Sequence, residues 1–246
     1  MNSPPRMALI AALVLGGATG GQAASAQGFP DLGYMGATVG AGGLQTSAMN
    51  NVISMSVEAS AGPVRDTPSA PVSLTAYRAD PEVAQRVRRQ FIDWMNKQAG
   101  PEGGRQVEIA MARTDPVQNW AQLVASDGLR PGDTADALSA YWLMNWMIAN
   151  GGDNNRTQTQ AVRNQVRSTM AANPTYARLD EAQRQEFAEI LMLNFLIQHA
   201  AYVDAMKRGD QPALRELADA AVARFRNEMG VDLRQLQLTD QGMIRR

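Results

Sequence analysis

The chain of 246 residues contains no cysteine and a single histidine. Without a thiol it can form no disulfide, use no cysteine nucleophile and accept no lipid on a cysteine at its N-terminus. One histidine cannot supply a zinc site that needs two or more histidines from one chain. The fold must therefore be held by an ordinary hydrophobic core or by partners.

The sequence also lacks an excess of either charge. Lysine and arginine total 23 against 24 aspartates and glutamates. Removing residues 1–26 takes away one cation, Arg6, and no acid, so 22 basic side chains face 24 acidic ones and the formal charge is -2. Such a balance offers no strong electrostatic footprint for nucleic acid or anionic lipid, and we expect no nucleic-acid partner.

The N-terminus carries the most specific pattern in the chain. Arg6 precedes the apolar run Met7 to Leu15, and small residues then end in Ala24-Ser25-Ala26. This order is typical of a secretory signal peptide, with Gln27 as the mature N-terminus. A retained anchor is the alternative, but spanning a bilayer takes about 20 apolar residues, and glycines and Thr19 interrupt this run. We expect an exported protein, periplasmic or extracellular, with no integral membrane segment in its mature chain.

Residues 27–71 differ in composition from the rest of the chain. They are rich in Gly, Ala, Ser, Met and Asn, carry few charges and close with three prolines. This composition predicts a flexible arm. Within it, the segment from Val52 to Val57 would place alternate apolar side chains on one face if extended, so a short strand or docking segment is the alternative to a plain linker. The predicted organisation is a signal peptide at 1–26, an arm at 27–71 and a helical domain at 72–246.

Helix signals recur from Asp80 onward. Aspartates or prolines at Asp80, Asp115, Asp133, Asp180 and Pro212 precede apolar stripes and favour helix starts. The stretches Leu138 to Ala149 and Ile190 to Val203 are apolar on nearly every side, as expected of helices surrounded by others. We predict an all-α fold, an irregular bundle of about six helices around these two central ones. The tail after Gly230 is expected to pack through Leu233, Leu236 and Leu238.

Three segments of this domain resemble an uncharacterised family of exported bacterial helical proteins, a domain of unknown function. They are Leu74-Thr75-Ala76-Tyr77-Arg78-Ala79-Asp80-Pro81, Gly128-Leu129-Arg130-Pro131-Gly132-Asp133 and Ala140-Tyr141-Trp142-Leu143. The resemblance covers about residues 74–246 and leaves the arm outside. It implies bacterial export and supplies no catalytic residues.

Four polar side chains interrupt the two apolar helices, and these are the candidate site residues: Asn145, Asn194, Gln198 and His199. Asn194 and Gln198 lie four apart and therefore share a helix face. A buried amide without a partner costs roughly 1–3 kcal/mol, so we predict a buried polar network between the helices. A structural network that fixes helix register is favoured over the polar end of a small-molecule cavity.

Catalytic motifs are not found. His199 has no Gly-x-Ser-x-Gly elbow to pair with, and Leu196 stands where a Glu-x-x-His di-iron motif needs its glutamate, so a structural histidine is favoured. Glu186 and Glu189 are adjacent on a helix but are expected to form a solvated face, as are the arginines Arg86, Arg88, Arg89, Arg156, Arg163 and Arg167. No catalytic residue, metal site or cofactor is predicted.

Three functional classes stay open. The favoured one is a non-enzymatic envelope protein that binds a protein partner or the cell surface through helix faces and its arm. A periplasmic cell-wall hydrolase that uses a carboxylate such as Glu189 is the second. The third is a carrier of a small apolar ligand, whose pocket would be lined by the abundant Met and Trp side chains. The sequence does not indicate an oligomeric state.

Overall fold

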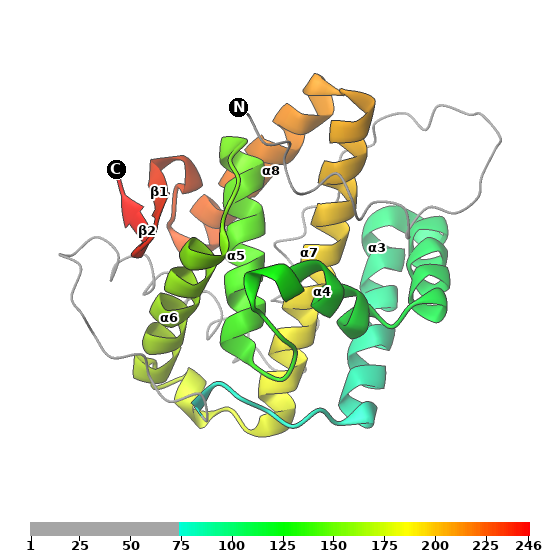
Figure 1. Cartoon of the computed structure of the whole chain (residues 1–246). Helices are drawn as coiled ribbons and strands as arrows, with labels where there is room; N and C mark the ends of the chain where they lie inside the picture. Colours follow the sequence, from blue (N-terminus) through cyan, green and yellow to red (C-terminus); the bar gives the residue numbers. More distant parts are fainter. Residues whose placement is uncertain (1–73) are drawn as a thin grey trace.

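The computed structural model describes residues 74–246. The predicted signal peptide, the arm and its segment from Val52 to Val57 lie outside the described residues. Six α-helices and one β-hairpin make up the described part (Figure 1). Their bounds are α3 Pro81–Arg113, α4 Pro116–Val124, α5 Thr134–Asn150, α6 Arg156–Ala172, α7 Glu181–Arg208, α8 Gln211–Met229, β1 Leu236–Thr239 and β2 Gly242–Arg245. The prediction of an all-α irregular bundle is confirmed.

The helix boundaries follow from local chemistry. Five helices begin after an aspartate whose carboxylate accepts a hydrogen bond from a free backbone N–H of the first turn, namely Asp80, Asp115, Asp133, Asp180 and Asp210. Three helices, α5, α7 and α8, end at a glycine in the left-handed conformation. Both devices satisfy backbone groups that a helix end leaves unpaired. The helix starts after Asp80, Asp115, Asp133 and Asp180 are those predicted, whereas the last helix begins after Asp210 and not at Pro212.

Helix α5 is the centre of the molecule. Every residue from Thr134 to Ala149 is buried, because α6, α7 and α8 all pack on α5 (Figure 1). The ring of Tyr141 on α5 stacks on Phe225 of α8 with centroids 5.9 Å apart. Helices α3 and α4 in turn pack on α7, which makes α7 the second central helix, as predicted.

The C-terminal tail folds into a hairpin that the sequence analysis did not foresee. Strands β1 and β2 pair antiparallel, with Leu238 opposite Met243. The indole N–H of Trp146 on α5 donates to the carbonyl oxygen of Leu236 at 3.1 Å, and the Gln165 side chain on α6 exchanges two hydrogen bonds with the Met243 backbone. The predicted packing of the tail through its leucines is confirmed, since all three are buried.

Helix α3 is broken inside its range. Gly100 has φ 74° and ψ 174°, and Pro101 follows it. The stretches on either side of Gly100 run alongside one another (Figure 1), and Val107 and Met111 of the second pack against the buried cluster that contains Phe91 of the first. None of the helices within residues 74–246 combines the length and hydropathy needed to cross a membrane.

We predict that Gly100→Ala destabilises the protein. The backbone at Gly100 lies in a region that is essentially restricted to glycine, so a Cβ there should lower the free energy of unfolding by about 1–3 kcal/mol. Urea denaturation measures the change. Gln98→Ala, at an exposed position of the same helix end, is the control and should stay within about 0.5 kcal/mol of the wild type. Equal stability of the two variants would contradict the assigned break.

Candidate functional site

An open cavity of about 240 Å³ lies between α3, α4 and α7. Phe91, Pro116 and Leu193 are buried in its lining, and six further apolar side chains there are only half-buried: Val107, Met111, Leu123, Leu196, Ile197 and Val203. A cavity of roughly 150 Å³ with apolar walls is large enough to bind benzene. The α3–α4–α7 cavity therefore has the size and lining to hold a small apolar group.

Polar side chains complete the lining of this cavity. They are Thr114, Asn119, Gln122, His199, Asp204 and Lys207. The carboxylate of Asp204 forms an ion pair with Arg208 at 2.9 Å, so its charge is already matched on the helix surface. An apolar interior with a few polar groups is typical of small-molecule sites.

A smaller and more polar cavity of about 110 Å³ adjoins the first. The two share Leu123 and His199 in their linings. The smaller cavity reaches α5, the start of α6 and the short 3-10 helix η4, Ala125–Asp127. Its polar lining consists of Ser126, Asp127, Asp153, Asn154, Thr159 and His199.

His199 stands at the junction of the two cavities. Its ring is half-buried and stacks on Phe195, with centroids 5.8 Å apart and the planes 8° from parallel. Burial lowers the pKa of His199 below its ordinary value of 6.5. The imidazole is therefore neutral at pH 7 and carries one hydrogen-bond donor and one acceptor.

The four sequence-predicted residues do not form one hydrogen-bonded set in the described structure. Asn145 accepts from Arg224 of α8 at 2.8 Å and donates to the Tyr141 carbonyl. Asn194 donates to the carbonyl of Ile190 in its own helix. The oxygen of Asn194 and both amide atoms of Gln198 have no hydrogen-bond partner in the described part of the chain, although the residues are buried.

Sequence reasoning missed Arg224, the partner of Asn145. The spacing of residues on α8 could have indicated that Arg224 is buried. Arg224 lies three residues after the apolar Ala221 and therefore on the same, buried face of the helix. Of the four predicted residues, His199 lines both of these cavities, and the other three line neither of them.

We predict opposite outcomes for two amide-to-leucine changes. Gln198→Leu removes two unpartnered amide atoms from a buried site, so the free energy of unfolding should stay level or rise, by up to about 1–3 kcal/mol. Asn145→Leu leaves the buried Arg224 without its acceptor, so it should lower the free energy of unfolding by about 1–3 kcal/mol or more. Chemical denaturation of both variants makes the comparison. If Gln198→Leu lowers the free energy of unfolding as much as Asn145→Leu does, Gln198 has a hydrogen-bond partner and the prediction is wrong.

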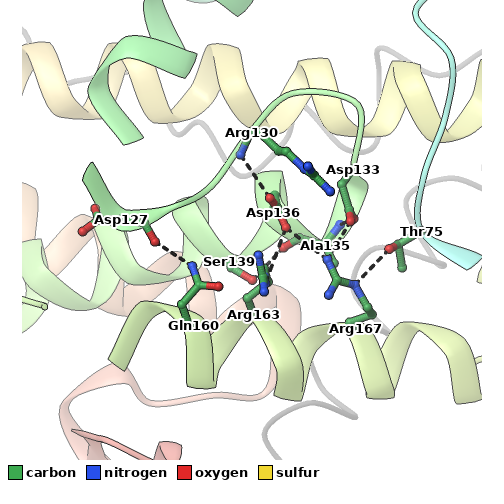
Figure 2. A network of polar contacts seen from close by, with 10 residues as sticks. All are labelled: Thr75, Asp127, Arg130, Asp133, Ala135, Asp136, Ser139, Gln160, Arg163 and Arg167. Atoms are coloured by element: carbon green, nitrogen blue, oxygen red, sulfur yellow. Dashed lines mark hydrogen bonds and ion pairs between the residues drawn. The ribbon is translucent and has the colours of Figure 1, made fainter. Parts of the chain in front are cut away.

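A buried ion cluster connects the beginning of α5 to α6, and Figure 2 shows its members. Arg167 of α6 donates to Asp133 at 2.6 Å, to Asp136 at 3.3 Å and to the Thr75 hydroxyl at 3.3 Å. The backbone N–H of Arg130 donates to the second oxygen of Asp136 at 3.0 Å. Every one of these donors meets an acceptor, as a buried charge requires.

Two backbone bonds tie the same place to the start of the described chain. The N–H of Tyr77 donates to the carbonyl of Gly132 at 3.0 Å, and the N–H of Thr134 donates to that of Thr75 at 2.9 Å. None of the ion-cluster residues lines either cavity. The cluster is thus a structural joint between three segments rather than part of the candidate site.

The expectation that the arginines of α6 form a solvated face is wrong for Arg167. Its exposed fraction is 4%, because α6 lays this face against the N-terminus of α5. Arg163 is less buried and lies 3.9 Å from Asp136. Burial, together with the negative charge of Asp133, raises the pKa of Asp136 from its ordinary 3.8 to about 6.

Asp136 should make stability depend on pH. Between about pH 4 and pH 6 the folded protein keeps a proton on Asp136 that the unfolded chain has already released, so stability falls as the pH rises through this window. A difference of about two pKa units corresponds to roughly 3 kcal/mol. Asp136→Asn should flatten this part of the curve, measured by urea denaturation at pH values from 4 to 7. An unchanged slope would contradict the raised pKa.

Glu186 and Glu189 do not form the solvated face expected of them. Their exposed fractions are 6% and 4%. Glu186 pairs with Arg86 at 3.1 Å, and Glu189 accepts from Gln185 at 2.7 Å, while Gln185 also bonds the backbone of Asp80. The reason is that α3 packs on this side of α7 and covers both carboxylates. Burial raises the pKa of Glu189.

Comparison with known proteins identifies a family whose function is unknown. A family model described as a family of unknown function, DUF6683, matches residues 3–245. The match extends past the expected range of about 74–246 to nearly the whole chain. No curated protein matches the chain, and no solved structure matches it either.

Proposed function

The chain belongs to the DUF6683 family, whose function is unknown, and we propose that it is an exported, non-enzymatic protein that binds a small apolar molecule in the α3–α4–α7 cavity. Export rests on the signal-peptide pattern of the first 26 residues. Binding rests on one observation, the open cavity with half-buried apolar walls.

The walls of this cavity leave apolar surface in contact with water. Six of the apolar lining side chains are half-buried and would lose that contact if a ligand covered them. Burial of apolar surface is worth about 25 cal/mol per Å², which supplies the driving force. For a ligand of this size we expect a dissociation constant in the millimolar to micromolar range, roughly 4–8 kcal/mol of binding free energy.

The outer surface supports cavity binding over apolar docking of a protein. Among the described residues, the exposed large hydrophobic side chains are Leu74 and Met206. They lie at the start of the described chain and near the end of α7, far apart in sequence. Protein interfaces usually have a contiguous apolar core, and two exposed hydrophobic side chains so far apart in sequence do not indicate one.

The geometry also supports binding over hydrolysis. Glu186 and Glu189, the carboxylates that a hydrolase was expected to use, are buried in bonds with Arg86 and Gln185. Neither glutamate lines the α3–α4–α7 cavity or the smaller cavity beside it. A glycosidase needs its two carboxyl groups on opposite sides of a substrate cleft.

Ethylbenzene provides a direct test of the cavity. We predict that it shifts the methyl resonance of Met111 in a saturable way, measured by NMR on the purified protein. Ala200→Phe places a ring inside the cavity lining and should weaken ethylbenzene binding at least about tenfold. Ala112→Phe adds the same ring at an exposed position of α3 outside the lining and should leave binding unchanged.

Two outcomes would overturn the proposal. One is the absence of a saturable shift at Met111 up to the solubility limit of ethylbenzene. The other is equal binding by Ala200→Phe and the wild type when both are folded, as judged by their denaturation curves.

A further inference from the structure

The charged groups of the α3–α4–α7 cavity stand at one end of its lining. Asp204 and Lys207 lie about one to two turns beyond His199 on α7 and remain in contact with water. Asp204 is paired with Arg208, and Lys207 also takes part in an interaction of its own. Exposed charges that are already engaged contribute little to binding. A ligand with a carboxylate or an ammonium would therefore gain little from them.

His199 brings a neutral imidazole to the same lining. Its ring is half-buried, stacks on Phe195 and forms no hydrogen bond with the residues that the structure describes. Phe195 covers one ring face and lines only the smaller cavity of the two, so His199 meets the larger cavity with its other face and its edge, which carries the nitrogens. Because burial lowers the pKa of His199, one nitrogen is a donor and the other an acceptor at pH 7.

The apolar walls and the neutral imidazole together select an uncharged ligand with one polar group. A charged head group would lose its hydration among apolar side chains without gaining an opposite charge. A purely apolar ligand would displace water from His199 and leave the imidazole nitrogens unbonded, which costs binding free energy. A hydroxyl group can donate to one imidazole nitrogen or accept from the other, so it fits either tautomer of the ring.

We propose, on the basis of the function proposed above, that the ligand is a small uncharged alcohol. Its apolar part lies against the walls of the α3–α4–α7 cavity, and its hydroxyl group forms a hydrogen bond with the imidazole of His199. The apolar walls supply the affinity, and His199 is the residue that determines which polar group the cavity accepts.

A series of compounds with a similar apolar part and different polar groups tests the inference: ethylbenzene, 1-phenylethanol, 1-phenylethylamine and phenylacetate. In calorimetric titrations, 1-phenylethanol should bind at least as tightly as ethylbenzene, because His199 replaces the water that the hydroxyl group gives up. The ammonium of 1-phenylethylamine and the carboxylate of phenylacetate lose more hydration, so these two compounds should bind at least about tenfold more weakly than the alcohol.

His199 can also be observed directly in the wild-type protein, since it is the single histidine of the chain. In NMR spectra of the untagged protein, 1-phenylethanol should shift the imidazole nitrogen resonances in a saturable way, whereas ethylbenzene should shift them far less. His199→Phe keeps a ring beside Phe195 but removes both nitrogens. It should weaken 1-phenylethanol binding at least about fivefold and leave ethylbenzene binding within about twofold.

Gln122→Ala is the matched control, because Gln122 lines the same cavity with an uncharged amide that is exposed to water. This variant should leave the affinities for 1-phenylethanol and ethylbenzene unchanged. Asn119 is a second uncharged, half-buried side chain of the lining. If Asn119→Ala rather than His199→Phe weakens 1-phenylethanol binding selectively, the assignment of the hydrogen bond to His199 is wrong.

The outcomes separate the two proposals. If ethylbenzene binds but 1-phenylethanol binds more weakly than ethylbenzene, or a charged member of the series binds most tightly, the alcohol inference is wrong and the apolar site stands. An equal effect of His199→Phe on the alcohol and on ethylbenzene would also overturn it. If no member of the series binds, the proposed function fails and the inference fails with it.

Discussion

The arrangement of the described helices depends on one buried cation meeting two buried carboxylates. Asp133 caps α5, Asp136 lies in its first turn, and Arg167 reaches both from α6. Removing one partner from such a cluster leaves a buried charge unpaired, at a cost of about 3–5 kcal/mol. The joint also holds the chain at Thr75, so the end of α5 where the segments converge is determined by charge rather than by apolar packing.

With its N-terminus held in this way, α5 can be apolar along the rest of its length. Its buried residues are surrounded by α6, α7 and α8, and the C-terminal hairpin closes the remaining side through Trp146. Paired polar groups such as Asn145 with Arg224 connect these helices, whereas Gln198 has no partner in the described structure. The buried amides of the bundle therefore differ in what they contribute to stability, although the sequence places all of them in apolar helices.

The candidate site lies where this close packing ends. The break at Gly100 turns α3 back, and its second stretch lines the cavity together with α4 and α7. On the far side of Leu123 and His199, polar loops border the smaller cavity. The larger, mostly apolar cavity and the smaller cavity thus share Leu123 and His199 in their linings.

The sequence by itself determined where most of the helices begin, because an aspartate cap acts within a few residues, and the apolar pattern showed which helices are central. It did not determine which polar side chains pair. Arg167 and Glu186 were expected in solvent and are buried, since they pair with residues 34 and 100 positions away. Only the tertiary structure decided the ion cluster, the pairing of Asn145 and the two cavities at His199, because each depends on how separate helices meet and not on the local order of residues.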